Sequence, residues 1–162
     1  MTELATRVHL LLRAGGHTVA TAESLTGGRL AALLTDTPGA SQTFLGGVVT
    51  YATELKRSLL DVSQEVIDSV GVVSAECAEA MATGMKALAG ATYALATTGV
   101  AGPEPQEGKP AGTVYVGIAG PGLVTSVRLQ LSGDRQAIQA QTCEQALGEL
   151  EAVLRREEPA VG

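Results

Sequence analysis

The sequence has few aromatic residues and few of the residues that build the commonest catalytic and metal sites. Its 162 residues include one phenylalanine, three tyrosines and no tryptophan, so its core must be aliphatic. The histidines are His9, within a predicted helix, and His17, just before the first predicted strand. The cysteines, Cys77 and Cys143, fall on apolar helix stripes. A His-dependent triad, a cysteine nucleophile and a metal site are therefore not expected.

Long hydrophobic runs and an excess of positive charge are also missing. No apolar run approaches the roughly 20 residues that span a bilayer, and the charged residues within 1–14 exclude a signal peptide. The formal net charge is −6 and aromatic residues make up 2%, which argues against a nucleic-acid-binding surface. Without a CxxC pair, the two cysteines are expected to be reduced thiols of a cytoplasmic protein. We therefore predict neither a membrane nor a nucleic-acid partner.

Helical and β patterns alternate along the chain. Helical patterns are predicted at 1–14, 29–34, 53–60, 63–70, 74–89 and 138–154. The β-rich runs are 18–22, 44–51, 91–96, 113–119 and 123–131. This order predicts one three-layer α/β/α domain over residues 1–162, with a mixed, mostly parallel sheet, a late β-hairpin, and ligands at the loops that follow strand ends.

The helix predicted at 74–89 has a defined start, a defined end and an apolar face. Ser74 has the features of a helix N-cap. The helix that it begins carries an apolar stripe at helical spacing and ends at Gly90. The stripe consists of Cys77, Met81, Gly84, Met85 and Leu88.

The first candidate site segment is AESLTGG, residues 22–28. A hydroxyl such as that of Ser24 at a strand-to-helix turn lies near unpaired backbone N–H groups, which favour anions and developing oxyanions. We place these N–H groups near Thr26, Gly27 and Gly28. Alternatively, Ser24 or Thr26 only caps the next helix, and the glycines allow tight packing.

The second candidate segment is Tyr51-Ala52-Thr53-Glu54-Leu55-Lys56. With Thr53 as the N-cap, Lys56 would lie in the first helical turn, where the helix dipole disfavours a cation. Burial would lower the pKa of Lys56 further and make it a neutral general base. The alternative is an exposed lysine whose charge is offset by Glu54.

Two further segments combine glycine with groups that bind ligands. Residues 97–103, TTGVAGP, let backbone approach a ligand closely at Gly99 and Gly102, and Thr98 adds a hydroxyl. Residues 132–135, SGDR, place Arg135 at a helix start, where its guanidinium can pair bidentately with a phosphate. A structural turn and a solvent-facing arginine are the alternatives. Each segment is weak evidence by itself.

Taken in order, the segments are far more specific. Seven ordered blocks together resemble the CinA C-terminal domain family over about residues 3–154: AESLTGG, PGAS, FLGGVVTYATELK, GVVS, TTGVAGP, KPAGTVYVGIA and SGDR. Stand-alone members of this family are the nicotinamide mononucleotide deamidases called PncC. In the family's other arrangement, a molybdopterin-binding-like domain precedes this one. The sequence shows nothing of that domain, so we predict the stand-alone form.

The resemblance implies an enzyme that hydrolyses the carboxamide of nicotinamide mononucleotide to nicotinate mononucleotide and ammonia in pyridine-nucleotide salvage. By motif, Ser24 is the nucleophile and Lys56 the general base. Tyr51, Thr98 and Arg135 match positions that line the family's pocket. We add the hypotheses that Tyr51 relays the proton or positions Lys56, and that Arg135 and the glycine-rich loops hold the 5′-phosphate. No cofactor is implied, and the family favours a homo-oligomer, such as a dimer.

The chain departs from the family pattern in one loop, and two other functions also fit its sequence. Where relatives commonly carry a glycine pair, this chain has Glu104-Pro105, which stiffens the loop and adds negative charge near the predicted phosphate site. One rival is a non-catalytic nucleotide-binding or protein-interaction domain related to competence and damage-inducible proteins. The other is hydrolysis of a different pyridine-like amide or nucleotide.

Overall fold

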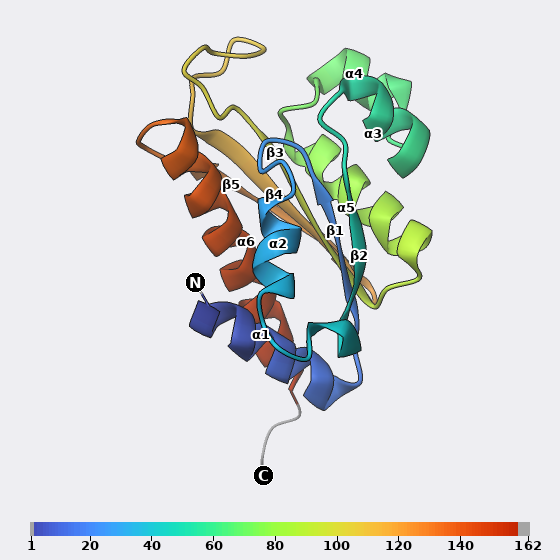
Figure 1. The fold of residues 1–162 in the computed structure, drawn as a ribbon. Helices are drawn as coiled ribbons and strands as arrows, with labels where there is room; N and C mark the ends of the chain where they lie inside the picture. Colours follow the sequence, from blue (N-terminus) through green and yellow to red (C-terminus); the bar gives the residue numbers. More distant parts are fainter. Residues whose placement is uncertain (1, 159–162) are drawn as a thin grey trace.

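Five strands form one mixed sheet that has helices on both faces (Figure 1). The computed structural model describes residues 2–158. Its helices are α1 (Thr2–Gly15), α2 (Arg29–Thr35), α3 (Thr53–Leu60), α4 (Gln64–Val70), α5 (Ala75–Ala89) and α6 (Arg135–Glu157), with a 3₁₀ turn η1 (Ala40–Gln42). Its strands are β1 (Val19–Glu23), β2 (Phe44–Val49), β3 (Tyr93–Gly99), β4 (Thr113–Gly120) and β5 (Leu123–Gln130).

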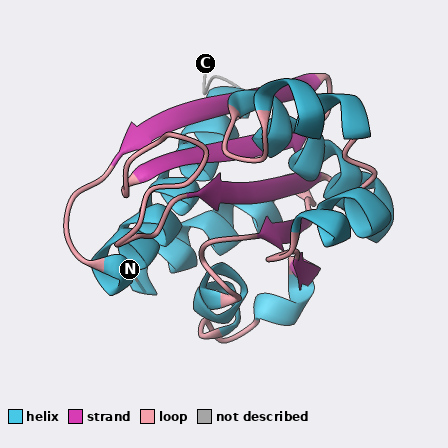
Figure 2. Ribbon diagram, turned by 90° about the horizontal axis from the view of Figure 1, so that it is seen from above, coloured by secondary structure: helices cyan, strands magenta, loops and turns pink. Residues whose placement is uncertain are grey.

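The strand order is β2-β1-β3-β4-β5. The first three strands in this order are parallel to one another, whereas β4 runs antiparallel to both β3 and β5. The predicted α/β fold, with its mixed, mostly parallel sheet and late hairpin, is thus confirmed. Because β1, β2 and β3 are parallel, their carboxyl ends meet at one edge of the sheet, where the loops gather (Figure 2).

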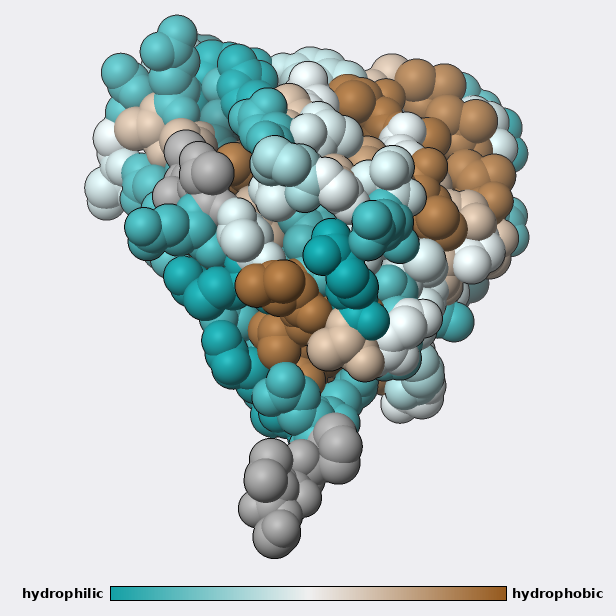
Figure 3. Space-filling model, turned by 60° about the horizontal axis from the view of Figure 1, so that its bottom comes forward, coloured by the Kyte–Doolittle hydropathy of each residue, from teal (hydrophilic) through white to brown (hydrophobic). Residues whose placement is uncertain are grey.

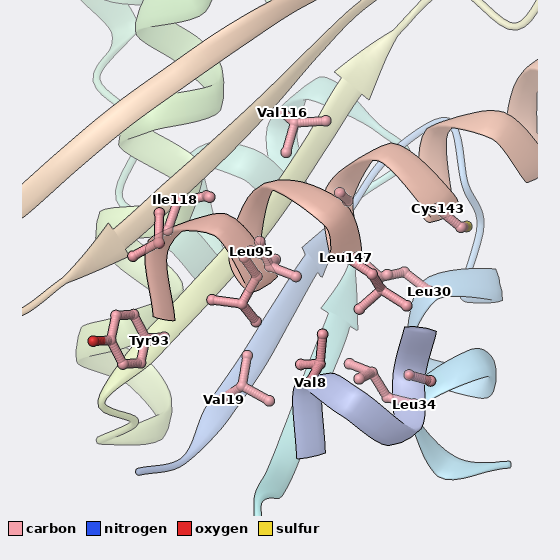
Figure 4. Close-up of a cluster of buried hydrophobic side chains, with 14 of the residues drawn as sticks. Val8, Val19, Leu30, Leu34, Tyr93, Leu95, Val116, Ile118, Cys143 and Leu147 are labelled. Atoms are coloured by element: carbon pink, nitrogen blue, oxygen red, sulfur yellow. The ribbon is translucent and has the colours of Figure 1, made fainter. Parts of the chain in front are cut away.

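Aliphatic side chains fill both spaces between the sheet and its helices. On the face covered by α1, α2 and α6, residues such as Val8, Leu34 and Leu147 meet Val19 and Leu95 of the sheet (Figure 4). On the other face, α5 packs Cys77, Met81 and Met85 against the small alanines of β1 and β3. Small strand residues allow α5 to lie close to the sheet.

The glycine in the middle of α5 has a specific packing role. A methyl group on Gly84 would lie 1.9 Å from the carbonyl oxygen of Leu60, the last residue of α3. Only glycine lets the end of α3 approach α5 this closely. The contact fixes α3, and with it the direction in which Lys56 points.

The structure corrects three details of the sequence-based reading. Leu88 is not part of the core: it is 54% exposed and lines an open cleft between α3 and α5. The N-cap of α3 is Ala52 rather than Thr53. Strand β3 runs on to Gly99, because Thr97 and Thr98 pair with β4, so these threonines belong to the sheet and not to the following loop. Ser74 does cap α5, and its side chain accepts the N–H of Cys77.

The face of the molecule drawn in Figure 3 has polar areas interrupted by apolar patches. Leu55, Leu59 and Leu88, on α3 and α5, are among the exposed large apolar side chains. Within the described part of the chain, no helix is both long enough and apolar enough to cross a membrane.

Candidate active site

The turn that carries Ser24 is folded around the buried carboxylate of Glu23, the last residue of β1. This side chain is 1% exposed. Its two oxygens accept the backbone N–H groups of Gly28 (3.2 Å), Leu30 (2.9 Å) and Ala31 (3.1 Å), and also the hydroxyl of Thr26 (2.6 Å). A carboxylate at this position satisfies the free N–H groups at the start of α2 and interacts favourably with the helix dipole.

The residues that follow Ser24 therefore stabilise the turn, whereas the sequence predicted that their N–H groups bind an oxyanion. The hydroxyl of Thr26 lies 2.6 Å from Glu23 and 2.8 Å from the hydroxyl of Thr97. Gly27 donates its N–H to the Ser24 carbonyl, and Gly28 donates to Glu23. Both glycines are left-handed, with φ of 58° and 100°. These N–H groups are occupied and do not face the cleft, so the structure does not support them as an oxyanion site.

The N–H of Leu25, directly after Ser24, is a second candidate donor. Leu25 lines the same cleft as Ser24. Among residues 2–158, nothing accepts a hydrogen bond from its N–H. A free N–H next to a nucleophilic serine is the arrangement that stabilises a developing oxyanion.

Lys56 is buried and contacts Ser24. The lysine side chain extends from α3 and is 1% exposed. Its Nζ lies 3.0 Å from the Ser24 Oγ and 2.6 Å from the carbonyl oxygen of Thr50. Thr50 in turn donates its N–H to the Glu23 carbonyl, so the ends of β1 and β2 together position both functional side chains. The alternative of an exposed Lys56 is thereby excluded.

Burial lowers the pKa of the Lys56 amino group, and the negative charges of the Cys77 thiolate form and of Glu107 oppose this effect. Burial also raises the pKa of the Cys77 thiol to about 11, so Cys77 carries no charge at neutral pH. A neutral amine has two N–H donors and one lone pair. One N–H can serve the Thr50 carbonyl while the lone pair accepts the Ser24 hydroxyl proton, as a general base requires.

Ser24 and Lys56 open onto a cleft of about 370 Å³ at the carboxyl ends of the strands. The predicted residues that line it are Tyr51, Thr98, Gly99, Gly102 and Arg135. The Thr98 hydroxyl donates to the Val72 carbonyl at 2.6 Å and so joins two walls of the cleft. A methyl group on Gly99 would lie 2.6 Å from the Thr113 carbonyl oxygen, which explains why glycine is needed there.

Arg135 and Tyr51 meet at the rim of the cleft. The Arg135 guanidinium donates to the carbonyl oxygen of Gly102 and to the hydroxyl of Tyr51, both at 2.6 Å. Tyr51 is 59% exposed. Its hydroxyl is engaged with Arg135 and makes no hydrogen bond to Lys56 or Ser24, so the structure gives no support to Tyr51 as a proton relay. It places Tyr51 among the groups that can contact a ligand at the entrance.

Sequence reasoning assigned no role to Glu23 or Thr50, although both matter to the geometry. The role of Glu23 could have been inferred from its position, because an acidic residue just before a Ser-x-Thr-Gly-Gly turn can accept the N–H groups at the start of the next helix. The Thr50 contact is made by a backbone carbonyl, which leaves no trace in residue type. Among residues 2–158, no group of three or more His, Cys, Asp or Glu side chains could hold a metal ion.

Comparison with known proteins now assigns the chain to a family. The family model of the CinA C-terminal domain matches residues 1–154. The chain belongs to the CinA C-terminal domain family. A CinA-like protein of Frankia casuarinae is 52% identical over 130 residues, which cover 80% of this chain and 30% of that protein. The chain spans about a third of the length of such curated CinA relatives.

Solved structures of CinA proteins have the same fold. A competence-damaged protein (CinA) superfamily protein from Klebsiella pneumoniae is 40% identical, with a TM-score of 0.93, and 96% of this chain aligns with 98% of that one. Competence damage-inducible protein A from Klebsiella pneumoniae subsp. pneumoniae is 38% identical, with a TM-score of 0.94 over 97% and 98% of the two chains. The CinA fold therefore covers almost the whole of this chain.

Glu23→Ala should destabilise this CinA domain strongly. The substitution leaves the buried N–H groups of Gly28 and Leu30 without their acceptor, at a cost on the order of 3 kcal/mol in the free energy of unfolding. Urea denaturation followed by circular dichroism measures the change. Glu144→Ala, which removes an exposed carboxylate from α6, is the control and should change stability by less than about 0.5 kcal/mol. Equal stability of the two variants would contradict the role given to Glu23.

Proposed function

We propose that this chain hydrolyses the carboxamide of nicotinamide mononucleotide to nicotinate mononucleotide and ammonia, with Ser24 as nucleophile and Lys56 as general base. The observation that carries the proposal is the 3.0 Å contact between Lys56 Nζ and Ser24 Oγ, made by a lysine that is 1% exposed. A serine hydroxyl is a weak nucleophile and needs a base within hydrogen-bond reach. A buried lysine without a carboxylate partner provides one.

In the first half of the reaction, neutral Lys56 accepts the Ser24 hydroxyl proton while Oγ attacks the amide carbon. The carbonyl oxygen becomes an oxyanion and accepts the free N–H of Leu25. The protonated Lys56 keeps one N–H on the Thr50 carbonyl and transfers its new proton to the amide nitrogen. The C–N bond breaks, ammonia leaves, and the acyl group remains on Ser24.

In the second half, a water molecule takes the place of ammonia. Lys56, neutral again, accepts a proton from this water as its oxygen attacks the ester carbon. The tetrahedral intermediate collapses, Lys56 returns the proton to Ser24 Oγ, and nicotinate mononucleotide is released. The sum is one amide and one water giving one carboxylic acid and one ammonia, so every group of the protein returns to its starting state.

The mouth of the cleft suits the phosphate of the substrate. Arg135 lies in the loop-to-helix turn that starts α6, and its guanidinium is held by the Gly102 carbonyl and the Tyr51 hydroxyl. A phosphate can replace either neutral acceptor and form a stronger, charge-assisted hydrogen bond. Glu104 also lines the cleft, and its negative charge would oppose a bound phosphate, so the hydrogen bonds from Arg135 must outweigh this repulsion.

Ammonia release from nicotinamide mononucleotide by the purified protein tests the proposed reaction. The phosphate-free riboside and free nicotinamide are the comparison substrates. The proposal predicts turnover of the nucleotide and kcat/KM values at least about tenfold lower for both comparison substrates, since each lacks the group that Arg135 binds. No ammonia from the nucleotide with a folded protein would refute the proposal and favour a non-catalytic nucleotide-binding domain.

Arg135→Ala should raise KM for the nucleotide about 10- to 100-fold and leave kcat nearly unchanged, because the lost hydrogen bonds to phosphate stabilise substrate and transition state alike. Arg128→Ala, on strand β5, removes the same charge away from the cleft and serves as the matched control. Steady-state kinetics on both variants give the comparison. A fall in kcat with an unchanged KM would show that Arg135 does not act as the phosphate ligand.

A further inference from the structure

A glutamine is buried on the inner face of α6. Gln139 is 5% exposed, and its buried neighbours on this helix include the apolar residues Ile138 and Leu147. Burying a side-chain amide costs free energy unless its polar atoms find hydrogen-bond partners. The Nε2 of Gln139 donates to the backbone carbonyl of Leu25 at 2.9 Å. The buried amide is therefore directed at the residue that follows the proposed nucleophile, Ser24.

The Leu25 carbonyl depends on this one donor. The Ser24 carbonyl before it accepts the N–H of Gly27 at 3.1 Å, which closes the turn after β1. Among residues 2–158, Gln139 alone donates to the Leu25 carbonyl. The Leu25 side chain is itself buried in the core. Because the contact with Gln139 is buried, its loss would leave a carbonyl that must either stay unpaired or move to reach water.

The segment Ser24-Leu25 is held at both of its ends. The N–H of Ser24 donates to the hydroxyl of Thr97, on β3, at 3.4 Å, and the carbonyl of Leu25 accepts the amide of Gln139. The peptide group between these anchors carries the N–H of Leu25. The Ser24 Oγ lies 3.0 Å from the Lys56 Nζ. Because catalysis needs reacting groups aligned to a fraction of an ångström, the two anchors determine whether Oγ and the Leu25 N–H can act on one carbonyl group.

The same helix carries the proposed phosphate ligand. Arg135 precedes Gln139 by about one helical turn, so the two side chains leave one face of α6 roughly 6 Å apart along the helix axis. Arg135 donates to the Gly102 carbonyl at the mouth of the cleft, whereas Gln139 donates to the Leu25 carbonyl beside the nucleophile. A single helix therefore sets the distance between the group that would hold the phosphate and the group that would attack the amide.

We infer that Gln139 is a positioning residue of the proposed amidohydrolase: its hydrogen bond to the Leu25 carbonyl holds the Ser24-Leu25 segment in the conformation that aims the Ser24 Oγ at the substrate. The inference rests on the proposed function for its kinetic consequences, but not for the hold of Gln139 on the turn. Gln139 does not touch the reacting atoms. It acts through the backbone that carries the nucleophile, so its loss should slow the chemical step and leave substrate binding nearly unchanged.

Gln139→Met removes the hydrogen bond and keeps a side chain of similar length. The kcat for ammonia release should fall about 10- to 100-fold, the loss expected when a reacting group is misplaced by up to about 1 Å. KM for the nucleotide should change less than about threefold, in contrast to Arg135→Ala, because the phosphate contact is untouched. Gln145→Met, the same substitution at an exposed position of α6, is the matched control and should keep the parent kcat. Both variants are assayed at a temperature at which circular dichroism shows them fully folded.

Amide hydrogen exchange, followed by NMR, provides a readout that does not need activity. The N–H groups of Ser24 and Gly27 are both hydrogen-bonded in the parent turn. In Gln139→Met they should exchange at least about tenfold faster, because the turn opens locally. The N–H groups of Val116 and Ile118, on the central strand β4, should be accelerated several-fold less. A purely structural role would lower the stability of the whole domain and accelerate the turn and β4 equally.

These experiments distinguish failure of the inference from failure of the proposed function. Unchanged exchange at Ser24 and Gly27 in Gln139→Met would overturn the inference, whatever the protein catalyses. Equal acceleration in the turn and in β4 would also overturn it, and so would a loosened turn with the parent kcat. A loosened turn in Gln139→Met, when even the parent protein releases no ammonia, would support the hold of Gln139 on the turn and refute the proposed reaction alone.

Discussion

Ser24→Ala should lower kcat for ammonia release by a factor on the order of 10⁴ or more, since it removes the hydroxyl that forms the acyl intermediate. Ser24 is the serine whose Oγ contacts Lys56. Thr26 lies near Ser24 in the chain, and its hydroxyl donates to the Glu23 carboxylate. Thr98 lines the cleft, and its hydroxyl donates to the Val72 carbonyl. Neither can replace Ser24 as a nucleophile.

Ser69→Ala is the matched control for this experiment. Ser69 lies on α4, and its hydroxyl donates only to the Glu65 carbonyl of the same helix. Both variants should fold, and KM for the nucleotide should change little in either one. If Ser24→Ala retained more than about a tenth of the parent kcat, a water molecule activated directly by Lys56 would be the better mechanism.

Lys56→Met should lower kcat by about 10²- to 10⁴-fold, the contribution of a positioned general base. Methionine matches the length and burial of the lysine but accepts no proton. In the parent protein, activity should fall as the pH drops below the pKa of Lys56, because the protonated amine cannot accept the Ser24 proton. The variant should lose this acidic limb, since its residual reaction no longer depends on that ionisation.

The pH profile, measured from pH 5 upward on both proteins, distinguishes a base from a structural lysine. Lys86→Met, on α5, controls for the loss of a lysine charge elsewhere. A Lys56→Met variant with low activity but an unchanged acidic limb would contradict the assignment, because another group would then be responsible for the ionisation.

Local chain patterns predicted most of the fold. Glycines at 15–16, 90, 120 and 122 mark the ends of elements, and apolar periodicity separates helices from strands. The errors fall where tertiary contacts override local signals. Leu88 has the spacing of a core residue but lies beyond the cover of α3. Thr97 and Thr98 resemble loop residues, yet pairing with β4 draws them into the sheet.

The site was predictable in its residue types but not in its geometry. Ser24 and Lys56 are 32 residues apart, and only the parallel pairing of β1 with β2 brings their elements together. The role of Glu23 was not predicted, because this side chain binds backbone N–H groups and sequence patterns do not reveal such contacts. Two of the predicted oxyanion donors are engaged elsewhere: the Gly27 N–H donates to the Ser24 carbonyl and the Gly28 N–H to Glu23, so we propose the N–H of Leu25 as the donor.

A double-mutant cycle on Ser24 and Lys56 tests most directly whether the two act as one catalytic unit. Ammonia release would be measured for the parent, Ser24→Ala, Lys56→Met and the double variant under identical conditions. A nucleophile and its base depend on each other, so the double variant should be no more than a few-fold slower than Ser24→Ala alone. If the two losses multiplied instead, Ser24 and Lys56 would be contributing independently, and the Ser/Lys mechanism would be wrong.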